Sequence, residues 1–342
     1  MKTEIFKVTE NSISELEYAS KLLNDGELVA IPTETVYGLG ANALNKTACL
    51  NIFKAKGRPN DNPLIVHIAE PQDAEKIART NQLYYKLAEK FMPGPLTVII
   101  PKRDIIPYEV TAGLDTVAIR CPIHKVARKL IEIAKIPIAA PSANTSGKPS
   151  PTAAHHVYDD MNGKIPLILD GGECEVGVES TVISITENSI VLLRPGAVTV
   201  EMLKTVCPNV TVANAVKEEL KQGETALSPG MKYKHYAPKA NLYLVNDKTI
   251  SFIELAREKQ KNENCAIMCY DEEIPLLDSK KLLPVGKKDD IKEQTKRLFD
   301  LLRKADDLGV DTVYAHLPYD EGESLAIYNR MIRACAHRVL GG

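Results

Sequence analysis

Short β-rich runs and amphipathic helices alternate along this chain in two separate series, and that pattern restricts its fold more than any other feature. The first series runs from Leu28 to about Val198. Its helices come at intervals and do not follow every strand, which favours an α+β or mixed α/β sheet with an open or concave face for its loops. The strand candidates are ELVAIP, PLIVHI, LTVIIP, DTVAIR, IPIAAP, PLILDG, STVISI and IVLLRP.

Several segments of the same series have the apolar period of a helix packed on a sheet. The last of them has Ser150 as its expected N-cap and Pro151 at the first helical position, where the missing N–H of proline costs nothing. The helix candidates are TACLNIFKAK, AEKIARTNQLYYKLAEKF, HKVARKLIEIAK and PTAAHHVYDDM.

The second series begins after Ala240, beyond a stretch in which the first pattern breaks. It holds the strand candidates NLYLV, CAIMCY, KLLPV and DTVYAHLP, and the long helix DDIKEQTKRLFDLLRKADDLG, whose leucines lie on one face. We therefore predict a larger domain over residues 1–205, a linker over 206–240, and a smaller three-layer α/β domain over 241–342.

The composition fits two soluble domains and excludes some classes of partner. A net charge of −2 over 342 residues gives no general attraction to nucleic acid or to an anionic membrane. We see no apolar run of membrane-spanning length and no signal-peptide core, so we expect a cytoplasmic protein. The seven cysteines lie mostly in apolar stretches, and we read them as reduced, buried thiols. Cys265 and Cys269 lack the second pair that a zinc site would need.

Polar chemistry is concentrated first in IPTETVYGLG, residues 31–40. A strand runs into Pro32, two threonines flank Glu34, and Gly38 and Gly40 open the backbone. Hydroxyls beside glycines suit the close approach of a polar ligand. An ordinary strand and turn would explain this segment equally well.

The second concentration is KAKGRPNDNPLIVHI, residues 54–68. A helix ends at Lys56, and Arg58 follows in a loop that Pro59 and Pro63 stiffen. A rigidly held guanidinium suits bidentate contact with a phosphate or a carboxylate. His67, inside an apolar strand, is read first as a core histidine.

The third concentration is IAAPSANTSGKPSPT, residues 138–152, where loop hydroxyls, an amide and an expected helix N-terminus form an anion-binding corner. It is not a Walker A motif, and the chain has no G-x-G-x-x-G fingerprint. Arg58, Arg120 and Arg194 each lie near a proline at the end of an element. If they converge on one face, they neutralise a triphosphate and a carboxylate.

In order along the chain, PTETVYGLG, the Lys-x-Arg of Lys56 and Arg58, NPLIVHI, TAGLDTVAIR, the Ser-x-Asn of Ser142 and Asn144, GVESTV, LLRPG and PGMKYKHYAP resemble the YrdC-like L-threonylcarbamoyladenylate synthases. The resemblance is to the long form with a second domain. It covers residues 1 to about 240, and beyond that it rests on position and α/β character. It implies a YrdC-like twisted, open mixed sheet with a concave face, followed by a Rossmann-like C-terminal domain.

The resemblance implies a reaction. L-threonine, bicarbonate and ATP, with Mg²⁺, would give L-threonylcarbamoyladenylate and pyrophosphate. The product would supply N6-threonylcarbamoyladenosine at position 37 of tRNAs that read ANN codons, through a downstream tRNA threonylcarbamoyl transferase. The protein would mainly position two anions and screen their repulsion, so it needs no conventional nucleophile.

The resemblance also assigns residues. Lys56 and Arg58 would be the catalytic pair. L-threonine would be held by Thr35, His67, Arg120, Ala140 and Ser180, with Arg120 on the carboxylate. ATP would be held by Arg58, Asn62, Thr116, Ser142, Asn144, Ser150, Arg194 and Tyr236, and no metal would have ligands of its own on the protein.

Three other readings stay open. A YrdC-fold module could bind RNA without adenylyl transfer, although the charge and the 5% aromatic content argue against extended RNA recognition. A carbamoyl-transfer module of the hydrogenase-maturation type would carry zinc-finger segments, and no C-x2-C pair exists here. In a third reading, which is compatible with the main one, the C-terminal domain regulates the protein or binds a partner, and catalysis is wholly N-terminal.

The linker contains SPGMKYKHYAPK, residues 228–239, whose rings and lysines a passive tether does not need. We predict that this segment folds as a lid over the nucleotide, with Tyr236 in contact with ATP. The alternative is that the rings pack between the domains.

Overall fold

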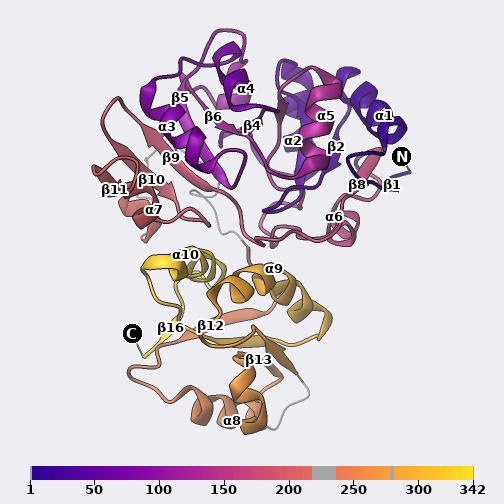
Figure 1. The fold of residues 1–342 in the computed structure, drawn as a ribbon. Helices are drawn as coiled ribbons and strands as arrows, with labels where there is room; N and C mark the ends of the chain where they lie inside the picture. The colour runs from indigo at the N-terminus through magenta and orange to yellow at the C-terminus, as the bar shows by residue number, and fades with distance from the viewer. Residues whose placement is uncertain (1, 218–235, 278–280, 342) are drawn as a thin grey trace. The chain divides into compact units, whose positions relative to one another are not determined.

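The fold is described from a computed structural model, which places residues 2–217, 236–277 and 281–341 (Figure 1). The chain divides into two compact units, which are described separately. The first comprises Met1–Ser146, Ser150–Glu175 and Glu179–Lys232; the second comprises Gly147–Pro149, Val176–Val178 and Tyr233–Gly342. Within the placed residues, no helix is both long enough and apolar enough to cross a membrane.

The first unit is built on an eleven-stranded mixed sheet of order β1-β8-β2-β3-β7-β4-β6-β5-β9-β10-β11. Neighbouring strands are often distant in sequence, so loops from separate parts of the chain meet at the sheet edges (Figure 1). The strands are β1 (Glu4–Lys7), β2 (Val29–Ile31), β3 (Gly38–Asn42), β4 (Ile65–His67), β5 (Leu96–Pro101), β6 (Thr116–Arg120), β7 (Ile138–Ala139), β8 (Leu167–Asp170), β9 (Thr181–Ile185), β10 (Ile190–Arg194) and β11 (Val210–Val212).

Helices of the first unit supply the apolar layer against this sheet. Leu16 and Leu23 of α1 and Leu130 of α5 pack with Val29 and Leu167 in one buried cluster. Burial of each such side chain contributes roughly 1.5–3 kcal/mol. The helices are α1 (Ile13–Asn24), α2 (Lys46–Lys56), α3 (Gln82–Phe91), α4 (Tyr108–Thr111), α5 (Lys125–Ala134), α6 (Ala154–Met161) and α7 (Val200–Lys204), with the 3-10 turns η1 (Pro71–Lys76) and η2 (Asn214–Val216).

The predicted strands of the first series all form strands, and the mixed sheet is confirmed. The predicted single helix over residues 74–91 is wrong in its first half. The 3-10 turn η1 ends at Lys76, and Ala78 then forms a β-bridge with Lys102. Helix α3 begins only after Asn81, whose side chain accepts the N–H of Tyr84 at 2.9 Å. Pairing with the sheet edge therefore overrides helical periodicity there.

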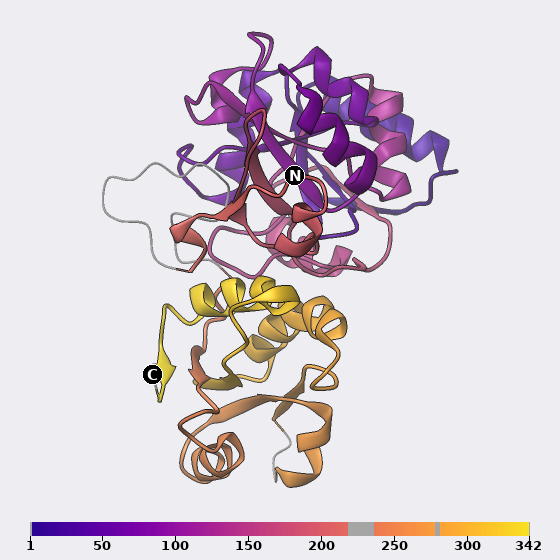
Figure 2. The same cartoon turned by 60° about the vertical axis from the view of Figure 1, so that its left-hand side comes forward.

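The second unit is a five-stranded parallel sheet of order β14-β13-β15-β12-β16. Helices α9 and α10 lie on one face and α8 on the other, in both views (Figures 1 and 2), which confirms the predicted three-layer α/β architecture. Its elements are β12 (Asn241–Val245), α8 (Phe252–Asn262), β13 (Cys265–Cys269), η3 (Asp271–Leu276), β14 (Leu282–Pro284), α9 (Ile291–Asp307), β15 (Thr312–His316), η4 (Gly322–Ser324), α10 (Leu325–Ala334) and β16 (Val339–Leu340).

All seven cysteines are free thiols and all are buried, as predicted. Cys265 and Cys269 lie at the two ends of β13 and belong to the apolar core of the second unit. Burial raises the pKa of the Cys269 thiol to about 12, which keeps it protonated and unreactive.

Candidate active site

Strand register in the first unit brings the ends of five neighbouring strands to one row. His67 at the end of β4 pairs with Arg120 at the end of β6, and Arg120 pairs with Thr97 near the start of β5. The start of β9 lies beside β5, and Arg194 at the end of β10 lies opposite the start of β9. His67, Arg120, Arg194 and Ser180, the residue before β9, therefore gather at one edge of the sheet.

Arg120 forms a buried ion pair with Glu34, which lies in the loop between β2 and β3. Its Nη2 stands 2.8 Å from Glu34 Oε1, and both side chains are 4% exposed. The two groups are close but not aligned as in a hydrogen bond. Both oxygens of Glu34, and Nε and Nη2 of Arg120, have no hydrogen-bond partner among the described residues. Buried charges without hydrogen bonds cost free energy of folding. A ligand that forms hydrogen bonds to these donors and acceptors would remove that cost.

A hydroxyl network extends the site from Arg120 toward β10. Ser180 Oγ lies 2.7 Å from Thr97 Oγ1, and Nη2 of Arg194 donates to Ser180 Oγ at 3.2 Å. Nε of Arg194 also donates to the Ser180 carbonyl at 3.1 Å. Arg194 thus fixes the side chain and the backbone of Ser180, both of which are buried.

His67 is neutral in this setting. Burial, followed by the nearby Arg120 cation, lowers the pKa of His67 to about 3. Its Nδ1 lies 3.2 Å from the Ile65 carbonyl oxygen, which favours the tautomer with the proton on Nδ1. Nε2 is then a neutral acceptor beside a cationic guanidinium.

Thr35 and Ala140 are also placed in buried backbone near this sheet. The Thr35 hydroxyl lies 2.9 Å from Thr33 Oγ1, and the Thr33 hydroxyl donates to the Val36 carbonyl at 2.6 Å, which ties the loop in a tight turn. Ala140 follows β7, and a Cβ placed on Gly38 would come within 3.1 Å of the Ala140 methyl. Glycine at position 38 therefore lets β3 approach β7.

Lys56, of the Lys-x-Arg motif, forms hydrogen bonds to both residues of the Ser-x-Asn motif. It is the last residue of α2 and is 2% exposed. Its Nζ donates to the Ser142 carbonyl at 2.5 Å and to the Asn144 carbonyl at 2.6 Å, and lies 3.3 Å from Asn144 Oδ1. Ser142 Oγ donates to the same Asn144 oxygen at 2.5 Å. The buried ammonium holds the Ser142–Asn144 loop in shape; its contact with phosphate or carbamate stays a prediction.

The loop after α2 holds Arg58 and Asn62. The guanidinium of Arg58 lies over the Phe53 ring at 5.4 Å, and its Nη2 donates weakly to the Asn62 carbonyl at 3.5 Å. Asn62 is fully buried, yet neither atom of its side-chain amide has a hydrogen-bond partner among the described residues. A buried amide left unpaired costs about 1–3 kcal/mol, which is tolerated where a ligand completes it. Thr116 stands at the start of β6 and is partly exposed.

The prediction that Ser150 caps a helix is wrong. Helix α6 begins at Ala154, three residues later than expected, and its N-cap position is Ala153. The Ser150 hydroxyl donates instead to Glu179 Oε1, and both side chains are buried. Position 150 thus links two loops of the first unit, and the helix-terminus part of the predicted anion corner is absent there.

Tyr236 lies in the second unit and within the predicted lid, residues 228–239. Its backbone has a positive φ of 65°, and its ring stacks on Phe299 at 5.1 Å, with Arg330 at 5.9 Å from the ring centre. Residues 228–235 of the lid lie outside the described part of the chain. The predicted contact between Tyr236 and ATP stays a prediction.

Sequence reasoning missed two members of this cluster, Glu34 and Thr97. Glu34 was visible within the quoted threonine-rich motif, but its pairing with a residue 86 positions later depends on the fold. Thr97 lies in LTVIIP as the one hydroxyl of an otherwise apolar strand, and that interruption was the available signal.

Two family models match the chain. One, described as "Telomere recombination", matches residues 21–196, and one described as "Threonylcarbamoyl-AMP synthase, C-terminal domain" matches residues 198–336. Curated relatives extend along nearly all of it. The threonylcarbamoyl-AMP synthase of Pyrococcus abyssi is 45% identical over 95% of each chain. That of Bacillus subtilis is 43% identical over 95% of this chain and 94% of its own, and that of Schizosaccharomyces pombe is 41% identical over 94% and 88%.

Solved structures agree. P. abyssi Sua5 complexed with L-threonine has a TM-score of 0.88 and 42% identity, covering 99% of this chain and 98% of that one. A P. abyssi Sua5 variant with a histidine and a tyrosine both changed to alanine has a TM-score of 0.91 at the same identity and coverage. E. coli YciO, at 19% identity and a TM-score of 0.52 over 57% of this chain, shares the fold of the first unit.

Proposed function

The chain belongs to the family of threonylcarbamoyl-AMP synthases with a C-terminal domain, and on that premise we propose that it converts L-threonine, bicarbonate and ATP to L-threonylcarbamoyl-AMP and pyrophosphate. It is a nucleotidyltransferase, and its product is the intermediate for N6-threonylcarbamoyladenosine in tRNA. The transferase that takes the product to tRNA and the cytoplasmic location remain predictions of the sequence.

The observation that carries the proposal is the misaligned Glu34–Arg120 pair. A free α-amino acid is a zwitterion, with a carboxylate for Arg120 and an ammonium for Glu34. Its binding supplies hydrogen bonds to atoms that have none from the described residues, in a buried site where such bonds are strong. The neutral Nε2 of His67 can accept the threonine hydroxyl, and Ser180, fixed by Arg194, offers a second hydroxyl contact.

The chemistry follows from this orientation. The ammonium of threonine together with bicarbonate gives the carbamate, one water and one proton, and the Glu34 carboxylate stands where that proton is released. A carbamate oxygen then attacks the α-phosphate of ATP, the new P–O bond forms, and the bond to pyrophosphate breaks. Arg120 and Arg194 reduce the repulsion between the two anions.

We assign ATP to the side of the site formed by the loop after α2 and the loop after β7. In this assignment ATP contacts the guanidinium of Arg58 and the side-chain amide of Asn62, which has no hydrogen-bond partner among the described residues. Thr116, Ser142, Ser150 and Arg194 are the further contacts that we propose. No three His, Cys, Asp or Glu side chains converge as a metal site in the part of the chain that is placed. We therefore propose that Mg²⁺ enters with ATP, held mainly by phosphate oxygens.

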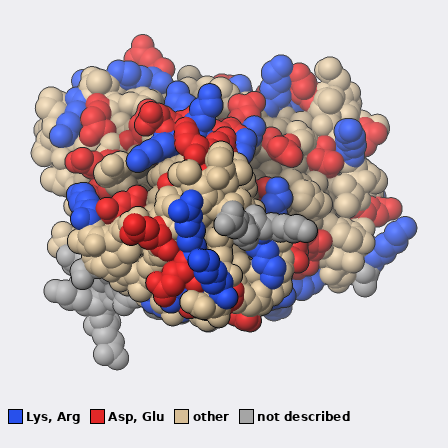
Figure 3. All heavy atoms as spheres, turned by 90° about the horizontal axis from the view of Figure 1, so that it is seen from below, with Lys and Arg blue, Asp and Glu red and all other residues tan. Residues whose placement is uncertain are grey.

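RNA binding without adenylyl transfer is not favoured. The curated relatives that match nearly the whole chain are named threonylcarbamoyl-AMP synthases. On the one face shown in Figure 3, Lys and Arg lie among Asp and Glu.

The test measures pyrophosphate release by the purified chain with L-threonine, bicarbonate, Mg²⁺ and ATP, and with each omitted in turn. We expect release only with the complete mixture, and threonylcarbamoyl-AMP as the second product. Equal release without threonine or without bicarbonate would overturn the assignment.

A further inference from the structure

The second unit has its own crevice, apart from the site proposed above. Its sheet is parallel, so the carboxyl ends of its strands meet at one edge. From β13 the chain continues to β14 on one side, and from β15 it continues to β16 on the other. The neighbouring strands β13 and β15 therefore form the point where the strand order reverses, and open α/β sheets bind ligands outside that point.

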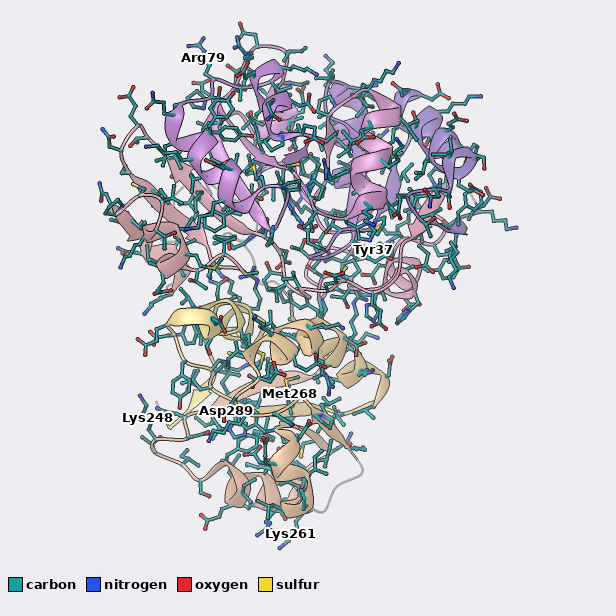
Figure 4. The ribbon with its side chains drawn as sticks, viewed as in Figure 1. Tyr37, Arg79, Lys248, Lys261, Met268 and Asp289 are labelled. Carbon is teal, nitrogen blue, oxygen red and sulfur yellow. The ribbon has the colours of Figure 1, made fainter. Side chains whose placement is uncertain are left out.

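A cavity of about 760 Å³ opens at this edge, within the usual size range of small-molecule sites. Every loop that follows one of the four main strands contributes to its lining: Asp247 and Lys248 after β12, Tyr270 after β13, Lys288 and Asp289 after β14, and Tyr319 after β15. Met268 of β13 and Leu298, Ile327 and Met331 of the two helices form its apolar wall. Figure 4 labels three of the lining residues, Lys248, Met268 and Asp289.

His316, the last residue of β15, fixes the loops at the opening of this cavity. Its Nδ1 lies 2.7 Å from Asp247 Oδ2, and its Nε2 lies 2.8 Å from Glu273 Oε2. The ring is stacked between Phe252 at 3.6 Å and Tyr270 at 4.4 Å. Although burial opposes the charge, the hydrogen bonds of the two carboxylates raise the pKa of His316. One imidazole therefore links the loops after β12, β13 and β15.

The loop between β14 and α9 is also held by hydrogen bonds. The N–H of Lys288 donates to Glu272 at 3.2 Å, and the side-chain amide of Gln294 donates to the carbonyls of Lys287 and Lys288 at 2.7 and 2.9 Å. Asp290 caps α9 by accepting the Glu293 N–H at 3.0 Å. This side of the cavity is therefore preformed, and the backbone N–H groups of Lys288 and Glu293 are not available to an anion.

The lining fits one class of ligand. A thioether and leucine wall beside tyrosine rings, of which Tyr319 is 66% exposed, suits a flat heterocycle. Lys248 and Lys288, on different loops, suit a single phosphate, and the carboxylates of Asp289 and Asp320 suit sugar hydroxyls. The same carboxylates would repel a continuous phosphate backbone, which excludes a polynucleotide.

We propose that this cavity of the C-terminal unit binds a mononucleotide, with the base against the Met268 wall and the phosphate between Lys248 and Lys288. The site is separate from the ATP site proposed for the first unit, and the proposal does not depend on catalysis.

The test uses the full-length chain with ¹³C-methyl methionine and reads the methyl signals of Met268 and Met331 during titration with AMP. Met161 and Met202, in the first unit, serve as internal references. We expect saturable shifts of the Met268 and Met331 signals, weaker binding of adenosine, and no shift with inorganic phosphate alone.

Exposed lysines give matched variants. Lys248→Glu and Lys288→Glu should each weaken AMP binding about tenfold, because a phosphate contact is reversed in charge. Lys261→Glu, on α8 at the far end of this unit (Figure 4), should leave it unchanged. Unmoved Met268 and Met331 signals at millimolar AMP, equal effects of the three variants, or shifts with L-threonine in place of AMP would each overturn the proposal. None of these readouts requires turnover, so this failure and that of the proposed reaction are distinguishable.

Discussion

The Glu34–Arg120 pair and the cluster of His316 with Asp247 and Glu273 both bring charged groups together at the ends of strands, but their hydrogen bonding differs. In the first unit, the carboxylate and two guanidinium nitrogens have no hydrogen-bond partner among the described residues. In the second unit, both ring nitrogens of His316 meet carboxylate oxygens within 2.8 Å. An unsatisfied charge pair costs stability and is useful when a ligand completes it, whereas a satisfied one fixes the loops around a site.

The largest effect expected from this difference is that of Arg120→Ala. Loss of the guanidinium removes the contact proposed for the threonine carboxylate and should lower threonine-dependent pyrophosphate release about 10³-fold. It also leaves Glu34 as a buried, unpaired charge, which should cost about 3–5 kcal/mol in urea unfolding. Arg79→Ala, on the surface of the same unit (Figure 4), is the control and should change neither quantity. Near-normal turnover by the Arg120 variant would remove this residue from the site.

A second comparison sets Asn62 against Asn329 of α10. Asn62→Leu removes a buried amide that has no hydrogen-bond partner in the described part of the chain, so stability should be unchanged or higher while the KM for ATP rises about tenfold. Asn329 is also buried but accepts from Nη1 of Arg330 at 3.0 Å. Asn329→Leu should therefore cost about 1–3 kcal/mol. Equal stability losses in the two variants would show that Asn62 is satisfied in solution.

His316→Phe tests the satisfied cluster. Phenylalanine keeps the stacking with Phe252 and Tyr270 but loses both contacts to carboxylates, and the free energy of unfolding should fall by about 2 kcal/mol. His155→Phe, at an exposed position of α6, is the matched control and should be neutral. A His316 variant as stable as the unaltered protein would mean that the contacts of His316 with Asp247 and Glu273 contribute nothing to the free energy of unfolding.

The smallest effect is a difference in the pH dependence of the two buried histidines. The pKa of His316 is raised, so its contribution is present below its unfolded pKa and is lost as pH rises through its folded pKa. The pKa of His67 is lowered to about 3, so the folded state resists protonation there, and its contribution is lost as pH falls below the unfolded value. Melting curves of the unaltered chain, His316→Phe and His67→Phe between about pH 5 and pH 8 should show opposite slopes for the two differences. Slopes of the same sign would contradict these assignments.

More of the fold than of the contacts within the site could be predicted from the sequence. Strands such as LTVIIP and NLYLV carry their own apolar signal, and both appear at the predicted bounds. The segment over residues 74–91 looked like one helix because periodicity does not register the bridge from Ala78 to Lys102. Ser150 looked like an N-cap because its acceptor, Glu179, is 29 positions away.

In the site, the residue types were predictable and their partners were not. Lys56 was assigned through its Lys-x-Arg motif, and its contact with phosphate or carbamate is still a prediction. The fold places its ammonium on carbonyls more than 80 positions along the chain, which the motif did not indicate. Long-range pairing of this kind depends on strand order, which no local pattern encodes.

The most direct test of the account is calorimetric binding of L-threonine alone to the unaltered chain and to Glu34→Gln. Glutamine keeps the shape of Glu34 but cannot pair with an ammonium, so we expect threonine affinity to fall about tenfold or more. Binding of threonine to Glu34→Gln as tightly as to the unaltered chain would contradict the claim that this buried pair is completed by the amino-acid zwitterion.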